Sequence, residues 1–375
     1  MTASGATTKA NPVEGSAVYP IGSRVNDRGR LEVGGCDVVE LAREFGTPAY
    51  VYVTDDIRAR ARAYLDAFRA RTEEFEVVYA SKAAPITAIE RILEAEGLSI
   101  DVASGGELST ALRAGFDRSR IHMHGNNKST TDLRRVVELG VGHVICDSVA
   151  EIERLDQLCA AAGRTQEILI RVTPGVEAET HSYVRTGQLD SKFGLGLADG
   201  LDADEPPSID AYVDVEVRSV ERLFDPAPRL LVEPGRSLVG NAGITLYEVG
   251  TVKEIPGVRT YVAVDGGISD NLRPMLYGSR YEAIIADRAA APPDTVVTIA
   301  GMHCESSDML VRDATIASPQ VGDVLVTPAT GAYGHAMANN YNAVPRPPVI
   351  LCSRGDARVA VRRETVEDLA RRDVD

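Results

Sequence analysis

The chain has 375 residues, 44% of them hydrophobic, which is enough for about two globular domains with real cores. A formal net charge of -15 leaves no concentrated basic face, and this excludes nucleic acid as a partner. Residues 1–9 lack the apolar segment of a secretory signal, and no apolar run reaches membrane-spanning length, so we expect a cytoplasmic protein without a membrane partner. The five scattered cysteines fit reduced thiols in that compartment.

From residue 76 on, short apolar runs alternate with segments of helical periodicity, which is typical of a parallel sheet covered by helices. Strands are predicted at residues 75–80, 98–103, 120–124, 143–146, 168–172 and 230–233. Between them lie helices such as the one predicted over 131–139, which ends at Gly140. In a closed βα barrel the turns at the carboxyl ends of the strands build the active site, so polar side chains there are the candidates for chemistry.

After residue 240 strand follows strand with few helices between, which predicts a separate β domain. Its strands are expected at 244–249, 260–264, 295–299, 323–327 and 348–352. The predicted organisation is an N-terminal segment (1–45, with a strand at 30–33) that joins the β domain, a barrel (46–239) and a C-terminal β domain (240–375).

Lys82 follows the apolar strand 75–80, in a chain with five lysines and 35 arginines. An amine that is partly desolvated at a strand end can condense with an aldehyde, whereas a guanidinium stays charged. The alternative is a lysine that simply reaches solvent from a strand tip.

Glu233, Pro234, Gly235 and Arg236 close the last predicted barrel strand with a carboxylate and a guanidinium three residues apart. A carboxylate beside a pyridine nitrogen keeps that nitrogen protonated, which is how proteins tune pyridoxal phosphate. A salt bridge within the turn is the alternative interpretation.

Two polar loops of the β domain carry further candidates. Residues 301–308 place the thiol of Cys304 beside the carboxylate of Glu305, and a protonated thiol could return a proton to a carbanion. Residues 265–278 supply Arg273 and Tyr277, and a guanidinium is the usual receptor for a carboxylate. A plain loop cysteine and a glycine-rich hairpin are the alternatives.

His122 and His124 lie two residues apart on a predicted strand and therefore face the same side. The sequence shows no third or fourth ligand beside them. We predict a structural or hydrogen-bonding role for these histidines and no metal site.

Together and in this order, the motifs resemble the pyridoxal-phosphate decarboxylases of the alanine racemase fold (fold type III), and most closely the diaminopimelate decarboxylase family. The segments that carry the resemblance are 79–83, 101–108, 124–129, 181–194, 233–236, 265–278, 303–308, 331–333 and 341–342. The resemblance covers most of the chain. It implies an α/β fold with a (β/α)8-type TIM barrel and a C-terminal β domain that the N-terminal segment completes.

Carried over residue by residue, the resemblance makes Lys82 the Schiff-base lysine, Glu233 the partner of the pyridine nitrogen and Cys304 the proton donor. It assigns Lys82, Glu233, Gly235, Arg236 and Tyr333 to the cofactor pyridoxal 5'-phosphate, and Arg236, Arg273, Tyr277, Glu305 and Tyr333 to the substrate. It also implies a homodimer in which Cys304 and Tyr277 of one subunit complete the site of the other.

One part of the family pattern is missing, close to residues 200–204. Relatives carry there a strand with a histidine that stacks on the cofactor ring, and a triple-glycine turn that holds the phosphate. Six predicted barrel strands where eight are needed agree with an internal deletion of about two βα units. A strand over 211–220 could fill part of the gap, but the helical spacing of apolar residues between 209 and 224 favours a helix.

The resemblance implies decarboxylation of meso-2,6-diaminopimelate to L-lysine and carbon dioxide. This substrate has an amine and a carboxylate at each end, so a site with both Arg273 and Glu305 suits it better than ornithine, which lacks the second carboxylate. Two other hypotheses stay open. The chain could be a catalytically impaired or regulatory relative without the phosphate-binding turn, or a decarboxylase of another basic amino acid.

Overall fold

The computed structural model describes residues 13–172 and 208–374. Its contacts divide the chain into two compact units. The first, here called the β unit, comprises Met1–Asp56 and Val239–Asp375, and the second, the βα unit, comprises Ile57–Leu238. The segment 181–194 and the gap near 200–204 that were identified in the sequence lie outside the described residues.

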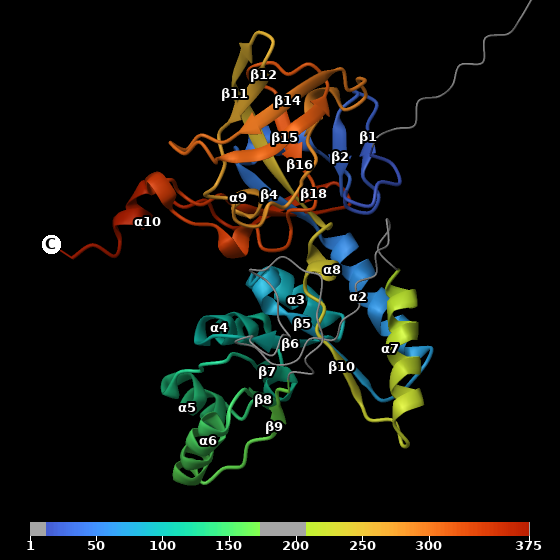
Figure 1. Cartoon of the computed structure of the whole chain (residues 1–375), viewed down its shortest axis with the longest axis vertical. Helices are drawn as coiled ribbons and strands as arrows, with labels where there is room; N and C mark the ends of the chain where they lie inside the picture. The colour runs from blue at the N-terminus through green and yellow to red at the C-terminus, as the bar shows by residue number, and fades with distance from the viewer. Residues whose placement is uncertain (1–12, 173–207, 375) are drawn as a thin grey trace, which may run out of the picture. The chain divides into compact units, whose positions relative to one another are not determined.

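The βα unit contains a six-stranded parallel sheet in the order β10-β5-β6-β7-β8-β9 (Figure 1). Its strands are β5 (Phe75–Ala80), β6 (Ser99–Val102), β7 (Ile121–Met123), β8 (His143–Cys146), β9 (Ile168–Ile170) and β10 (Leu230–Val232). All six strands predicted for this part of the sequence are confirmed, with bounds that differ by at most two residues.

Helices alternate with these strands along the chain. They are α2 (Thr54–Arg69), α3 (Thr87–Ala95), α4 (Gly105–Ala114), α5 (Thr130–Leu139), α6 (Val149–Ala162), α7 (Ile209–Leu223) and α8 (Arg236–Val239), with short 3-10 turns η1 (Ser81–Ala83) and η2 (Arg118–Arg120). The helices α4, α5 and α6 begin at serines 104, 129 and 148, whose side chains accept a backbone N–H of the first turn. Each ends at a glycine in the left-handed conformation, which only glycine adopts without strain.

Residues 209–223 form the helix α7, as the apolar spacing favours, and the alternative of a strand over 211–220 is wrong. Ser208 caps the helix by accepting the backbone N–H of Ala211. Val213 and Val217, four residues apart, are the buried side chains, which is the period of a helix and not of a strand.

Within the described residues the sheet of the βα unit is open. Its edge strands β9 and β10 each pair on one side only. Leu169 and Ile170 of β9 are 39% and 67% exposed, although a strand inside a closed barrel would bury such side chains.

The β unit consists of two sheets. A small sheet contains β1 (Arg24–Val25), β2 (Leu31–Val33) and β3 (Cys36–Asp37). The nine-stranded sheet contains β4 (Ala49–Val53), β11 (Gly243–Ile255), β12 (Arg259–Val264), β13 (Ile284–Ile285), β14 (Thr295–Ala300), β15 (Met309–Ile316), β16 (Val324–Thr327), β17 (Val349–Ser353) and β18 (Asp356–Val361). The helical segments are α1 (Val38–Phe45), η3 (Ala286–Arg288), α9 (Arg273–Tyr277), η4 (His335–Met337), η5 (Tyr341–Ala343) and α10 (Val366–Ala370).

The strand β4 pairs antiparallel with β11 and parallel with β17, so residues 49–53 belong to the β unit. The domain bounds predicted from the sequence place these residues in the barrel (46–239) instead. One apolar core joins N-terminal side chains such as Val33 and Val39 to Leu246, Val326 and Ile350. Burial of these side chains holds the first part of the chain to the last. In the described part of the chain, no helix is long and apolar enough to cross a membrane.

Candidate functional site

The residues predicted to form a site divide between the two units. Those of the βα unit are Lys82, Glu233, Gly235 and Arg236. Those of the β unit are Arg273, Tyr277, Cys304, Glu305 and Tyr333. The structure brings residues together within each of the two groups.

In the βα unit, Lys82 and Glu233 lie at the carboxyl ends of adjacent strands. Lys82 is in η1, directly after β5, and Glu233 directly follows β10. The two strands are parallel, with Val232 opposite Val77, and beyond them the Ala80 N–H donates a 3.1 Å hydrogen bond to the Pro234 carbonyl. The predicted pair therefore occupies one edge of one sheet.

Gly235 permits this close approach of the two turns. A Cβ at this position would lie only 3.0 Å from the Ala80 Cβ and 3.2 Å from the Ala83 Cβ. The next residue, Arg236, is exposed and begins α8. Gly235 thus has a packing role between β5 and β10.

The expectation that Lys82 is partly desolvated is wrong for this structure. Lys82 is exposed, whereas its neighbours Ser81 and Ala83 are buried. The 3-10 turn directs the side chains on either side of the lysine into the unit and the lysine outward. The amine is consequently accessible to a ligand.

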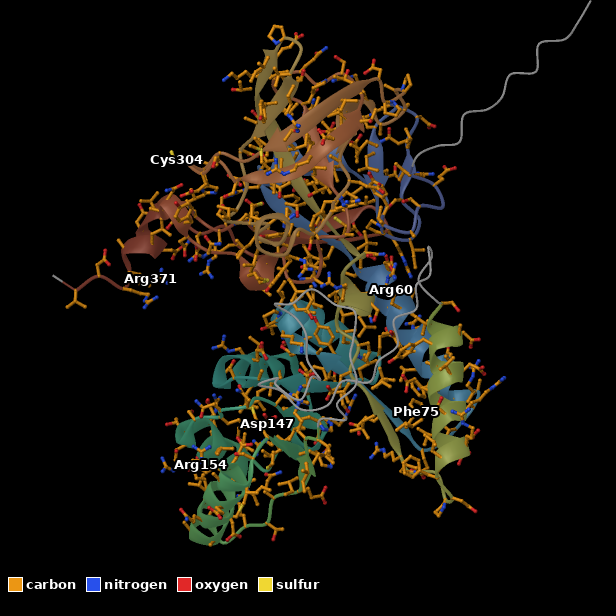
Figure 2. All side chains as sticks on the ribbon, viewed as in Figure 1. Arg60, Phe75, Asp147, Arg154, Cys304 and Arg371 are labelled. Carbon is orange, nitrogen blue, oxygen red and sulfur yellow. The ribbon has the colours of Figure 1, made fainter. Side chains whose placement is uncertain are left out.

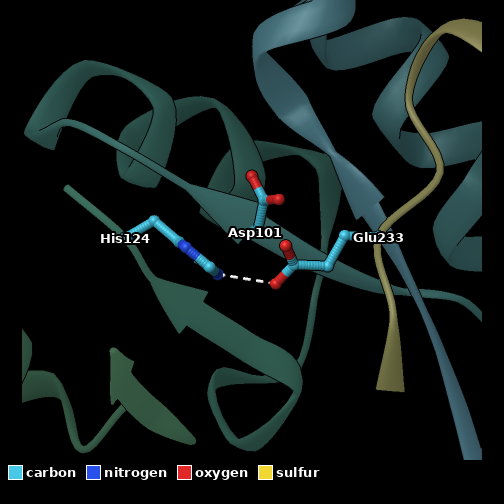
Figure 3. Close-up of side chains that lie close together, drawn as sticks. All are labelled: Asp101, His124 and Glu233. Carbon is cyan, nitrogen blue, oxygen red and sulfur yellow. Dashed lines mark ion pairs between the residues drawn. The ribbon is translucent and has the colours of Figure 1, made fainter. Parts of the chain in front are cut away.

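Asp101, His124 and Glu233 form a cluster (Figure 3), and the Lys82 ammonium acts on both of its carboxyl groups. Their ligand atoms all lie within 4.8 Å of one another, and His124 Nε2 lies 2.7 Å from Glu233 Oε1. This contact is an ion pair whose geometry falls short of a well-directed hydrogen bond. Asp101 is buried, the His124 side chain is 17% exposed and the Glu233 side chain is 44% exposed.

The two carboxyl groups of the cluster differ in their proton affinity. Burial raises the pKa of Asp101 to about 7, although His124 and the Lys82 ammonium act against it. Burial also favours the neutral form of Glu233, but its contact with His124 and the charges of His124 and Lys82 outweigh burial and lower the pKa of Glu233. At neutral pH Glu233 is an anion with one side open to solvent, next to a carboxyl group that readily holds a proton.

No further ligand beside the histidines is evident from the sequence, but in the structure Asp101 and Glu233 converge on His124 from strands distant in sequence. His122 has separate partners. Its Nε2 lies 3.0 Å from Glu76 Oε1, and its ring stacks on His143 at 4.9 Å between centroids. A hydrogen-bonding role, as predicted, describes His122 well.

In the β unit, Arg273 lies between two predicted partners. Its guanidinium carbon is 5.2 Å from the centre of the Tyr277 ring and 5.4 Å from that of Tyr333. Both distances are those of cation–π contacts. Tyr333 has a φ of 62°, which is unusual for a non-glycine residue and is typical of functional loops. Arg273, Tyr277 and Tyr333 thus form one group.

Cys304 and Glu305 lie in the loop between β14 and β15, and Cys304 is exposed (Figure 2). The Tyr341 hydroxyl donates a hydrogen bond to Glu305. The loop is fixed by Asp308, whose carboxylate accepts the backbone N–H of Ile268 at 2.8 Å and of His303 at 3.0 Å. These bonds hold the loop that carries Cys304 against the loop that leads to Arg273.

Comparison with known proteins places this site in a family context. Residues 54–204 match the model of the family described as "Pyridoxal-dependent decarboxylase, pyridoxal binding domain". The chain is 41% identical to a diaminopimelate decarboxylase of Bacillus subtilis (strain 168), with 94% of this chain and 97% of the relative covered. It is 42% identical to one from Actinosynnema pretiosum subsp. auranticum, with 97% of each covered. The crystal structure of a diaminopimelate decarboxylase from M. jannaschii in complex with L-lysine matches with a TM-score of 0.86 and 30% identity, over 95% of this chain and 98% of the other.

The alignment with the Bacillus subtilis relative is longer than the chain itself. It spans 426 positions, whereas the chain has 375 residues, so at least 51 positions hold no residue of this chain. The relative therefore contains segments that this sequence lacks.

Proposed function

The chain belongs to the diaminopimelate decarboxylases, and from this premise we propose that it uses pyridoxal 5'-phosphate to convert meso-2,6-diaminopimelate to L-lysine and carbon dioxide. The observation that carries the proposal is the position of Lys82 and Glu233 at the ends of two paired parallel strands. An accessible amine and an ionised carboxylate at one sheet edge are what the ring of this cofactor requires.

The cofactor supplies an electron sink for the charge left when carbon dioxide departs. We assign the Lys82 amine to hold it covalently and the Glu233 carboxylate to hold its pyridine nitrogen. Because Glu233 is an anion at neutral pH, it can keep a proton on that nitrogen.

The β unit supplies groups for the substrate. Arg273, held between the rings of Tyr277 and Tyr333, is assigned to a substrate carboxylate, with Arg236 as a second cationic group. Glu305 is assigned to the distal ammonium, and the exposed Cys304 thiol to delivering a proton from Sγ to the α carbon.

We further propose that the barrel of this chain lacks about two βα units. The sheet has six strands and two unpaired edges within the described residues, and the alignment with a relative leaves at least 51 positions empty. A triple-glycine turn for the phosphate would lie in such a segment. The chain would then hold the cofactor mainly through Lys82 and Glu233.

The assembly follows from the same family membership. We propose a homodimer in which Cys304 and Tyr277 of one subunit complete the site of the other, and a cytoplasmic location. An active protein that stays monomeric at all assay concentrations in light scattering contradicts the shared site.

Titration with pyridoxal phosphate tests the proposed function. The wild-type protein should gain the visible absorbance band of the bound cofactor and release L-lysine from meso-diaminopimelate, and Lys82→Ala should abolish both. Lys253→Ala is the matched control, because Lys253 is an exposed lysine of β11 in the other unit. Loss of the band in the control alone, or its persistence in Lys82→Ala, would refute the assignment of Lys82.

Comparison of pyridoxal with pyridoxal phosphate tests the proposed gap. Without a phosphate-binding turn, the two Kd values should agree within about tenfold, because each charged hydrogen bond to phosphate is worth roughly 1.5–3 kcal/mol. A much stronger preference for the phosphate ester means that another part of the chain holds the phosphate. No binding of either compound means an impaired relative.

A further inference from the structure

Glu233 has two carboxylate oxygens, and His124 occupies only one of them. The ion pair joins His124 Nε2 to Glu233 Oε1 over 2.7 Å, while 44% of the Glu233 side chain stays exposed (Figure 3). The His124 side chain itself is 17% exposed. The pair thus presents a fixed anion with a free face.

The backbone of His124 is fixed from two directions. Its N–H donates a 2.8 Å hydrogen bond to the Val102 carbonyl, which continues the pairing of β7 with β6. The carbonyl of the next residue, Gly125, accepts a 2.7 Å hydrogen bond from the buried Lys128 ammonium. A histidine mounted in this way has little freedom to leave Glu233.

We propose that His124 is a positioning residue for the proposed reaction: it holds one oxygen of Glu233 so that the other faces the pyridine nitrogen of the cofactor. Asp101 lies behind the pair as a buried carboxyl group within 4.8 Å of both. This inference rests on the proposed function and adds a residue to which the sequence motifs gave no role in the site.

The charges around Glu233 explain why the histidine is needed. The groups that face Glu233 are the Lys82 ammonium from η1, Asp101 from β6, His122 from β7 and His124, while Glu107 of α4 faces Lys82 and Asp101. Burial favours a neutral Glu233, and the largest effects that oppose burial come from His124. Without His124, burial would be opposed less strongly, and this favours the neutral form of Glu233.

The experiment compares wild type, His124→Leu and His124→Gln in the full-length protein. The Kd for pyridoxal phosphate, and separately for pyridoxal, is measured from the visible absorbance at pH 6, 7, 8 and 9. Ratios of variant to wild type at each pH remove the titrations of the cofactor itself. His143→Gln is the control, since His143 stacks on His122 and pairs with Glu167.

We expect His124→Leu to weaken binding at every pH, and to weaken it more at pH 6 than at pH 9, because the carboxylate loses the contact that most opposes its protonation. His124→Gln offers an amide N–H to Glu233 but no charge, so its binding should lie between that of wild type and that of His124→Leu. His143→Gln should follow wild type throughout.

Equal ratios at every pH overturn the proposal, because a merely structural histidine would weaken binding uniformly. A wild-type protein that binds neither compound contradicts the proposed function instead, and so separates the two failures. Since Asp101, His124 and Glu233 could also hold a cation, each titration is repeated with a chelator. Disappearance of the His124 effect in chelator identifies the residue as a metal ligand and also overturns the proposal.

Discussion

The Ser81 hydroxyl donates a 2.9 Å hydrogen bond to Glu90 Oε1, so the turn that carries Lys82 rests on a fully buried carboxyl group of α3. Thr110 of α4 contacts the same oxygen at 3.1 Å, while Glu90 Oε2 is buried with no partner among the described residues. Burial raises the pKa of Glu90 to about 7, although Ser81 and Thr110 act against it. The support of the lysine turn is therefore a titratable group.

Glu90 should make the βα unit less stable as the pH rises. Its folded pKa lies above the unfolded value, so its stabilising effect is complete below about pH 4.5 and is lost by about pH 7.5. The loss is on the order of 3 kcal/mol. Glu90→Gln should reduce this slope and leave the part that comes from Asp101, whose pKa burial also raises to about 7, measured as hydrogen-exchange protection of α3 and β6 between pH 5 and 8.

Glu153→Gln is the control for Glu90, because Glu153 is an exposed glutamate of α6. It should retain the slope of the wild type. Parallel curves for Glu90→Gln and wild type would show that Glu90 stays ionised in the folded protein.

A buried ion pair between Lys128 and Glu151 should stabilise the βα unit at the strand ends near His124. Lys128 Nζ lies 3.0 Å from Glu151 Oε2, and the Lys128 side chain is completely buried. Lys128→Met leaves an uncompensated buried carboxylate and should destabilise the unit by about 3–5 kcal/mol. Lys128→Met with Glu151→Met should recover part of that loss in urea unfolding.

Arg69→Ala is the control for Lys128→Met, because it removes an ion pair on the surface instead of a buried one. Arg69 and Asp66 form a pair 3.3 Å apart whose side chains are 61% and 72% exposed. Loss of such a surface pair costs less than about 1 kcal/mol. A comparable loss in Arg69→Ala and Lys128→Met would contradict the importance of burial.

Much of the sheet was predictable because its signals are local. The runs 75–80 and 143–146 are short, apolar and bounded by turn residues, and both are strands with those bounds. The partner of β4 was not predictable, since an apolar run does not indicate which strand it pairs with. β15 was missed because Arg312 and Asp313 interrupt its apolar pattern.

The site also combines residues with a local sequence signal and residues that only strand pairing brings together. Lys82 and Glu233 were identifiable as polar residues at strand ends, and Arg273 and Tyr277 as residues of one polar loop, whereas Tyr333 came only from the resemblance to a family. The cluster of Asp101 and His124 with Glu233 depends on β10 pairing with β5, a contact between residues more than 150 positions apart. The sequence motifs assign Asp101 no role and His124 only a structural or hydrogen-bonding one, because nothing in them places either residue beside Glu233.

Arg273→Ala should raise the KM for meso-diaminopimelate by about 100-fold, because a charged hydrogen-bonded pair contributes roughly 1.5–3 kcal/mol. Arg273→Lys should restore only part of the affinity, since an ammonium cannot stack between Tyr277 and Tyr333. Arg280→Ala, at an exposed arginine of the same loop, is the control. Efficient ornithine turnover that is indifferent to Arg273→Ala would favour a decarboxylase of another basic amino acid.

Cys304→Ala should lower kcat by about 100-fold or more, the usual contribution of a proton donor, while the Kd for pyridoxal phosphate stays unchanged. We expect an effect on kcat without an effect on the Kd because Cys304 lies in the β unit, whereas Lys82 and Glu233 lie in the βα unit. Cys159→Ala, at a buried thiol of α6, is the control for loss of a cysteine. A normal kcat in Cys304→Ala means that another group delivers the proton.

The open edge at β9 should promote self-association. Ile170 and Val172 are 67% and 62% exposed, and within the described residues β9 pairs only with β8. An exposed apolar edge strand offers unpaired backbone groups to a second chain, and a lysine on such an edge discourages pairing. Ile170→Lys should therefore reduce the growth of light scattering with protein concentration. Val258→Lys is the control, because it adds the same charge at a residue that is 74% exposed in the turn between β11 and β12. Its light scattering should grow with concentration as in wild type. An equal reduction in both variants would mean that the net charge, and not the sheet edge, controls self-association.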